Sequence, residues 1–197
     1  MVTSISGEVE EVVKRGRTAL AQFHQADQSQ VDAAVTAVAW SLYRPENARA
    51  LAELAVEETG LGNVEDKVSK NQRKTIGTLR DLLRAKTVGM VSEDRVSGIS
   101  KYAKPVGLVA AVTPSTNPAA TPINKSMMAI KGRNAIIVAP PPSAWRTAAM
   151  AVDLVRSELG KIGVPQNLIQ VLPEPVTYEA TRSLMEQADL VVATGAQ

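Results

Sequence analysis

Apolar residues recur at helical spacing through the first part of the chain. Val9, Val12, Val13, Leu20 and Phe23 are separated by charged positions, which is typical of an amphipathic helix with one face on a core. A first helix ending near Phe23 is therefore predicted.

Three more helices are predicted before residue 87. Ser29 is expected to cap the second, which ends before Pro45, and Pro45 itself fits the first turn of the third. Gly60 is expected to end the third helix. The fourth is strongly charged and runs from about Val64 to Lys86.

The pattern changes between Thr87 and Lys104. Apolar residues there alternate loosely with polar ones, at Val88, Val91, Val96 and Ile99. A β-hairpin is predicted, with its turn at Glu93–Asp94 and with pairing to another sheet as its expected role.

After residue 105, short apolar runs alternate with helical stretches, which is typical of βαβ units and a parallel sheet. The predicted strands are Gly107–Thr113, Ala135–Ala139, Leu168–Leu172 and Leu190–Ala193. The helices between them run from Pro118 or Pro122 to Lys131, from Ser143 to Leu159 and from Tyr178 to Gln187. The predicted fold is α/β: N-terminal helices and a hairpin, then a doubly wound parallel sheet.

Charge density divides the chain in the same place. Residues 1–104 hold 15 basic and 14 acidic side chains, whereas 105–197 hold 7 and 6. Two segments are therefore expected, 1–104 helical with the hairpin and 105–197 α/β. Because a doubly wound sheet continues from each strand into a loop and a helix, the stop four residues after the last strand suggests truncation.

Composition excludes several classes of chemistry. The chain has no cysteine and a single histidine, His24, so disulfides, thiolate nucleophiles and ordinary Cys or His metal sites are excluded and no metal site is expected. Its 22 basic residues nearly balance its 20 acidic ones, so nucleic acid is not an expected partner. No apolar run approaches a membrane span and no secretory signal is seen, so a cytoplasmic protein without membrane contact is expected.

Ligands of open α/β sheets bind at the carboxyl ends of the strands. The loops of interest are therefore 113–118, 140–143, 173–177 and 194–197. The glycine fingerprint G-x-G-x-x-G and the P-loop lysine motif are absent from all of them, which argues against an ordinary Rossmann domain or nucleoside triphosphatase.

Asn117 and Pro118 allow two interpretations. They match the N-cap and first position of a helix, although Pro122 can delay the regular helix by a turn. Alternatively, the Asn117 amide donates a hydrogen bond to a developing oxyanion.

The remaining loops are also open to two interpretations. Pro140, Pro141, Pro142 and Ser143 form either a rigid connection capped by Ser143 or a flat wall for an adenine ring. Thr194 and Gly195 either make a turn or approach a phosphate. Trp145 is expected in the core, and Lys125 is expected to extend its stem along apolar surface.

Several motifs, in order, resemble the cofactor-binding half of the aldehyde dehydrogenase superfamily. They are Gly107–Pro118 (GLVAAVTPSTNP), Lys131–Ser143 (KGRNAIIVAPPPS) and Ala193–Gly195. Upstream, Glu57–Asn71 (EETGLGNVEDKVSKN) and Lys86–Asp94 (KTVGMVSED) resemble its CoA-acylating branch, and the resemblance covers essentially the whole chain.

The resemblance implies NAD or NADP bound without the glycine fingerprint, and CoA as co-substrate of a small aldehyde. The adenosine would lie against Pro140, Pro141, Pro142 and Ser143. The nicotinamide end would lie along the first loop, at Thr113, Pro114, Ser115 and Thr116. Asn117 would hold the thiohemiacetal oxygen, with Thr116 as the alternative. A homo-oligomer associating through the hairpin is also implied.

Two departures from the family pattern matter. Ala139 and Pro141 stand where relatives carry Lys and His. The Glu with which ordinary family members hold the ribose hydroxyls is also missing from this loop, which leaves the choice between NAD and NADP open. The catalytic cysteine of the family lies beyond the position that matches Gln197, so the chain alone is expected to be inactive, with its catalytic domain missing. The alternative function is a non-catalytic nucleotide-binding or subunit-interaction domain.

Overall fold

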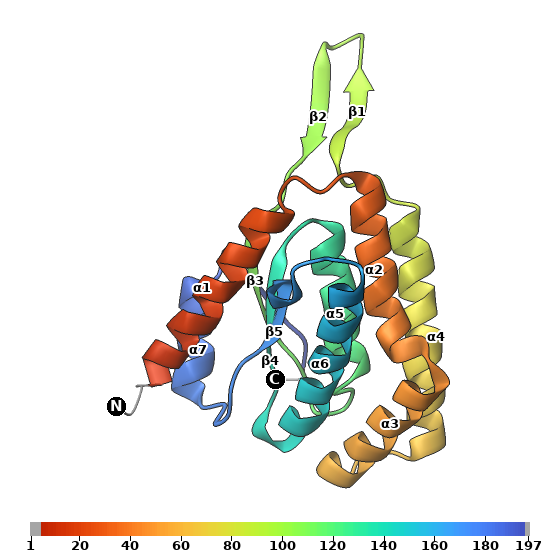
Figure 1. Ribbon diagram of the computed structural model, residues 1–197, viewed down its shortest axis with the longest axis vertical. Helices are drawn as coiled ribbons and strands as arrows, with labels where there is room; N and C mark the ends of the chain where they lie inside the picture. Colours follow the sequence, from red (N-terminus) through yellow and green to blue (C-terminus); the bar gives the residue numbers. More distant parts are fainter. Residues whose placement is uncertain (1–4, 196–197) are drawn as a thin grey trace.

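The computed structural model describes residues 5–195 (Figure 1). The N-terminal half consists of helices α1 (Ile5–Phe23), α2 (Gln28–Tyr43), α3 (Pro45–Thr59) and α4 (Val64–Leu83), then strands β1 (Gly89–Asp94) and β2 (Ile99–Ala103). The rest comprises β3 (Leu108–Val112), α5 (Ala120–Lys131), β4 (Ala135–Ala139), the 3-10 turn η1 (Pro142–Ala144), α6 (Trp145–Lys161), the 3-10 turn η2 (Gln166–Leu168), β5 (Ile169–Val171), α7 (Tyr178–Gln187) and β6 (Leu190–Ala193).

The caps of the first helices are partly those predicted. Pro45 begins α3, and Gly60 ends it in the left-handed conformation at φ 67°. The predicted Ser29 cap of α2 is wrong, because Asp27 caps it two residues earlier. Asp27 and Gln30 form a reciprocal capping box, in which each side chain accepts the other's backbone N–H, at 2.8 and 2.9 Å. This arrangement satisfies two backbone donors at once and leaves Ser29 inside the first turn.

The hairpin projects away from the body of the molecule at the amino end of β3 (Figure 1). Its turn lies at residues 95–98, so the turn predicted at Glu93–Asp94 is wrong. Asp94 is instead the last residue of β1, and its carboxylate accepts the N–H groups of Val96 and Ser97, which shapes the turn. Both strands are exposed along nearly their whole length.

The second sheet is parallel, with strand order β5-β4-β3-β6. Helices α5 and α6 pack on one face, and α1 and α7 contact the other, so the sheet is doubly wound as predicted (Figure 1). Helix α2 lies against α5 and α6, and α4 against α2 and α5, which adds an outer helical layer.

One hydrophobic cluster joins the N-terminal helices to the sheet. It contains Val9 and Phe23 of α1, Val35 of α2, the wholly buried strand β4, and β3 up to Ala111. The first helices are therefore built into the same core as the strands. The domain boundary near residue 104 stays a prediction.

Candidate functional site

The strand order reverses between β3 and β6, because β3 is followed along the chain by β4 on one side and pairs with β6 on the other. In open α/β sheets, the crevice outside the carboxyl ends of two such strands is the usual ligand site. Thr113 N–H donates to the Ala139 carbonyl at 3.1 Å, and Thr194 N–H donates to the Val112 carbonyl at 3.0 Å. The loops that begin at Thr113, Pro140 and Thr194 therefore meet at one edge of the sheet.

The fourth loop, 173–177, lies apart from this meeting point. It follows β5, and β4 stands between β5 and β3. Three of the four loops singled out from the sequence thus come together.

Thr113 follows β3 directly, at the edge of the sheet where the three loops meet. The residue is 4% exposed, and its hydroxyl has no hydrogen-bond partner within residues 5–195. A buried hydroxyl without a partner costs free energy, so a hydrogen bond from a bound group or an ordered water would offset that cost. Pro114 and Ser115 are half-buried, and Thr116 is exposed.

Asn117 does not cap a helix, so that interpretation of the Asn-Pro pair is wrong. Helix α5 begins at Ala120, its N-cap is Ala119, and no side chain caps it. The chain makes a further turn first, in which the Asn117 carbonyl accepts the N–H of Thr121 at 3.2 Å. This fits a delay of the regular helix by Pro122.

The Asn117 side chain is oriented by a lysine from another part of the chain. Lys70 Nζ donates to Asn117 Oδ1 at 3.0 Å, and Asn117 Nδ2 donates one of its hydrogens to the Thr116 hydroxyl at 3.3 Å. Because an ammonium only donates, this contact fixes the amide oxygen on the Lys70 side and leaves Nδ2 as the donor toward the other side.

A second lysine holds the same loop. Lys67 Nζ donates to the Thr116 carbonyl at 3.2 Å, and Lys67 is only 9% exposed. Burial, together with the charge of Lys70, lowers the pKa of the Lys67 ammonium. Both lysines lie on α4, nearly 50 residues before the loop, and no spacing in the sequence points to their contact with it.

The proline loop leaves the end of β4 as a short, stiff wall. Pro140 is buried, Pro141 half-buried, and Pro142 and Ser143 are exposed on the 3-10 turn η1. Ser143 does not cap α6, so that expectation is wrong. Trp145 packs against the core and donates from Nε1 to the Leu172 carbonyl at 2.8 Å, as expected of a core residue.

Glu58, the penultimate residue of α3, caps α6 instead. Its carboxylate accepts Arg146 N–H at 2.7 Å, Thr147 N–H at 2.9 Å and the Thr147 hydroxyl at 2.6 Å. A carboxylate at a helix N-terminus is favoured by both the free N–H groups and the dipole. The N-terminus of α6 is thereby already occupied, and the sequence reasoning missed this residue.

Thr194 and Gly195 complete the edge, the first half-buried and the second exposed. Lys125 lies on α5 beside an apolar hollow of about 140 Å³ that Met128, Leu190 and Val192 help to line, in keeping with a stem resting on apolar surface. No three Asp, Glu or His side chains of residues 5–195 gather closely enough to hold a metal ion. Over the same range, no helix is long and apolar enough to cross a bilayer.

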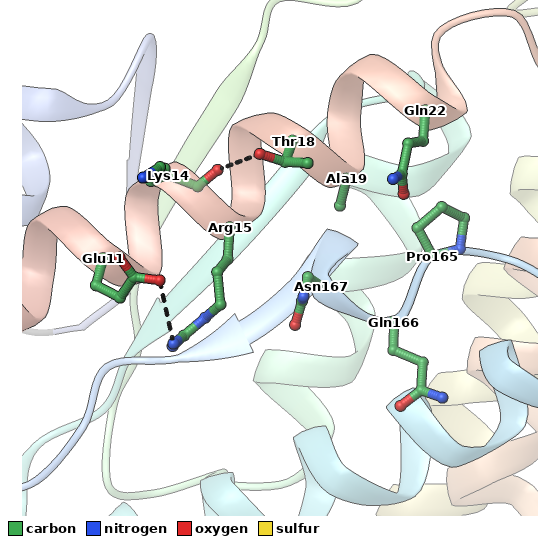
Figure 2. Close-up of a pocket in the computed structure, with 9 residues that line it drawn as sticks. All are labelled: Glu11, Lys14, Arg15, Thr18, Ala19, Gln22, Pro165, Gln166 and Asn167. Atoms are coloured by element: carbon green, nitrogen blue, oxygen red, sulfur yellow. Dashed lines mark hydrogen bonds and ion pairs between the residues drawn. The ribbon is translucent and has the colours of Figure 1, made fainter.

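Another hollow, of about 240 Å³, lies between α1 and the η2 turn (Figure 2). Most of the residues that line it are polar, and Glu11 forms an ion pair with Arg15 at 3.9 Å. Because η2 precedes β5, this hollow adjoins the amino end of that strand. It is separate from the edge where the three loops meet.

The doubly wound sheet, with loops that meet where the strand order reverses, places the chain in the class of open α/β proteins that bind ligands at the carboxyl ends of their strands. The chain belongs to the aldehyde dehydrogenase family, whose model matches residues 3–197. It is 53% identical to a sulfoacetaldehyde dehydrogenase (acylating) of Cupriavidus necator over 94% of this chain and 38% of that protein. It is 43% identical to a succinate-semialdehyde dehydrogenase (acetylating) of Clostridium kluyveri, over 95% and 41%.

Solved structures agree with this membership. An acetylating aldehyde dehydrogenase from Geobacillus thermoglucosidasius superposes with a TM-score of 0.90 at 36% identity, over 95% of this chain and 41% of that one. An engineered glycolyl-CoA reductase with bound NADP+ superposes with a TM-score of 0.79 at 26% identity, over 95% of this chain and 42% of that one. A propionaldehyde dehydrogenase of Rhodopseudomonas palustris with bound propionyl-CoA has the same TM-score and identity, over 95% and 41%. The chain thus spans about two fifths of the length of these relatives, in their N-terminal part.

Proposed function

We propose that the chain is the cofactor-binding part of a CoA-acylating aldehyde dehydrogenase, which converts an aldehyde, CoA and NAD+ or NADP+ into an acyl-CoA and the reduced cofactor. The observation that carries this proposal is the 53% identity to an acylating enzyme over 94% of the chain. The convergence of the Thr113, Pro140 and Thr194 loops supports it, because these are the loops that the family resemblance assigns to the cofactor.

The residues of the crevice fit a nicotinamide dinucleotide. The unpartnered Thr113 hydroxyl offers a hydrogen bond at its floor, and Pro140–Pro142 offer a stiff apolar wall for an aromatic base. When bound, the cofactor supplies the hydride acceptor. Pro114, Ser115 and Thr116 then border its nicotinamide end, and Thr194 and Gly195 its phosphates.

Asn117 has the role of oxyanion donor in this proposal. Lys70 holds its Oδ1 and Thr116 accepts one hydrogen of Nδ2, so the second Nδ2 hydrogen donates to the oxygen of the aldehyde as negative charge develops there. The 197 residues contain no cysteine, so the nucleophile that the resemblance implies is supplied from outside them. We therefore expect the chain by itself to bind cofactor without turning over aldehyde.

The decisive measurement is reduction of NAD+ or NADP+ by the complete enzyme with aldehyde, with and without CoA. CoA-dependent reduction with an acyl-CoA product is expected. Equal rates with and without CoA, with free acid as product, would show that the acylating assignment is wrong. Comparing the two cofactors in the same assay decides the preference between NAD and NADP, which the missing Glu of the proline loop leaves open.

We also propose that the complete enzyme is a homo-oligomer joined through the β1–β2 hairpin. The observation that favours this is the exposure of its apolar side chains: Val96 is 99% exposed, Tyr102 63% and Ile99 54%. Exposed apolar strands are typical of surfaces that pair with another chain. A cytoplasmic location stays a prediction, checked by cell fractionation.

Light scattering tests the hairpin. A Tyr102→Lys, Ile99→Lys double variant is expected to lower the particle mass, since it adds charge to the contact. Tyr178→Lys, at a 75% exposed position on α7, serves as the control and should leave the mass unchanged. A strictly monomeric parent protein would refute the hairpin's role.

A further inference from the structure

Two lysines on α4 face the loop that carries Asn117. Lys67 and Lys70 are three residues apart, so they lie on the same side of the helix. Their ammonium groups donate to the Thr116 carbonyl and to Asn117 Oδ1, at 3.2 and 3.0 Å. The candidate oxyanion donor therefore sits beside two positive charges.

Within residues 5–195, neither ammonium has an acidic partner; both contact only neutral oxygens. Lys67 is nearly buried, and Lys70 adds a repulsive like charge. Lys67 also lies in the first turn of α4, where the helix dipole disfavours a cation. A buried charge without a counterion is costly, so this arrangement fits a site completed by a bound anion.

The geometry limits where that anion lies. Lys70 Nζ donates to Asn117 Oδ1 at 3.0 Å, and Nδ2, the donor that would hold the substrate oxygen, belongs to the same amide group. The Lys70 ammonium therefore lies close to the position of the substrate oxygen. An acidic group one or two carbons from the aldehyde carbon spans such a separation. An uncharged aldehyde leaves the nearly buried Lys67 ammonium without a counterion.

We propose that Lys67 and Lys70 are specificity-determining residues, which bind the sulfonate or carboxylate of a short anionic aldehyde whose carbonyl oxygen is held by Asn117. This inference rests on the proposed function. The two acidic groups share the same recognition chemistry, namely anionic oxygens that accept from ammonium donors. Comparing aldehydes that carry each group identifies which one the site prefers.

The test is steady-state kinetics of the complete enzyme with CoA and its preferred nicotinamide cofactor. Sulfoacetaldehyde, succinic semialdehyde and uncharged acetaldehyde are compared in the parent, Lys70→Met and Lys67→Met. Loss of one charge-assisted hydrogen bond is expected to lower the ratio of kcat/KM for the preferred anionic aldehyde over acetaldehyde by about 10- to 100-fold. Lys70→Arg, which keeps the charge, should restore most of that ratio.

Lys86→Met is the control, because Lys86 lies just beyond the other end of α4, is exposed, and makes no side-chain hydrogen bond or ion pair within the described part of the chain. Its ratio should change less than about threefold, as for an ordinary surface charge. Lys70 is itself exposed, so Lys70→Met keeps the test valid if Lys67→Met fails to fold.

The outcomes separate this inference from the proposed function. If none of the three aldehydes supports cofactor reduction by the parent enzyme in the presence of CoA, the proposed function itself is overturned. An enzyme that uses acetaldehyde with CoA yet shows no preference for an anionic aldehyde, or loses activity equally for all aldehydes in Lys70→Met, would overturn only the role of the lysines. A variant that raises only the KM for CoA would likewise refute it, because the cations would then serve the co-substrate.

Discussion

Arg17 on α1 and Asp189 just before β6 form a paired contact between the two ends of the chain. Arg17 donates from Nη1 and Nη2 to the two carboxylate oxygens at 2.9 and 3.2 Å. The same carboxylate accepts the N–H of Leu108, the first residue of β3, at 2.6 Å. This contact joins the first helix, the central strand and the edge strand at the amino end of the sheet.

Acid is expected to weaken this contact. The hydrogen bond from Arg17, followed by that from Leu108, lowers the pKa of Asp189, although partial burial opposes the shift. A carboxyl whose pKa is lower in the folded state adds stability above its unfolded pKa and loses it as pH falls through the folded value. Because Asp189 is largely solvent-exposed, the effect is expected to be at most about 1 kcal/mol.

Urea unfolding of the parent and Asp189→Asn checks this. The difference in free energy of unfolding should be constant above about pH 5 and shrink as the solution becomes more acidic. A difference that does not vary with pH would mean that the carboxylate's charge contributes nothing to the contact.

Gly107 is expected to tolerate no side chain. Its φ is +134°, and an added Cβ would lie 2.1 Å from Asp189 Oδ2, an atom already held by Arg17 and Leu108. Gly107→Ala should lower the free energy of unfolding by about 2 kcal/mol or more, through backbone strain and loss of the contact.

Gly77→Ala is the matched control for Gly107. Gly77 lies inside α4 with open space around its Cα, so alanine there should stabilise by about 0.5–1 kcal/mol. Thermal or urea unfolding measures both variants. Equal effects of the two substitutions would contradict the argument from space and backbone conformation.

Glu58 is expected to be the chief cap of α6. Replacing it with Ala removes the acceptor of two backbone N–H groups and of the Thr147 hydroxyl, and Thr147 is fully buried. A loss of about 1–2 kcal/mol in the free energy of unfolding is expected. Glu57→Ala removes only a surface ion pair with Arg146, so a loss above that of Glu58→Ala would refute the capping role.

Asn117 is expected to be the oxyanion donor of the complete enzyme. Asn117→Ala should lower kcat by about 10²- to 10³-fold, the usual effect of removing one such donor. Thr116→Ala is the comparison, since Thr116 is the alternative donor. A larger loss in Thr116→Ala than in Asn117→Ala, measured by cofactor reduction, would move the role to Thr116.

Local patterns in the sequence predicted the elements well because burial imposes periodicity on each of them. The continuous apolar run Ala135–Ala139 is a fully buried strand, and Pro45 and Gly60 bound α3 as their backbone preferences require. The errors arose where side chains compete for the same backbone groups. Asp27, rather than Ser29, caps α2. The Asp94 carboxylate accepts the Val96 N–H, so the hairpin turn begins after Asp94.

The candidate site was only half predictable. The loops after β3, β4 and β6 follow from the rule that ligands bind at carboxyl ends of strands. The side chains of α3 and α4 that contact this region do not follow from that rule. Glu58 meets Thr147 across 89 residues, and Lys70 meets Asn117 across 47, and such contacts depend on how α3 and α4 pack in the folded chain.

The two ends of strand β3 lead to two different parts of the molecule. Its amino end receives the exposed hairpin, whereas its carboxyl end opens into the Thr113 loop (Figure 1). Under the proposed function, the residues for association and the residues for chemistry therefore lie at opposite ends of the same central strand. If both proposals hold, a substitution in the hairpin is expected to change the assembly without moving the residues at the carboxyl end of β3.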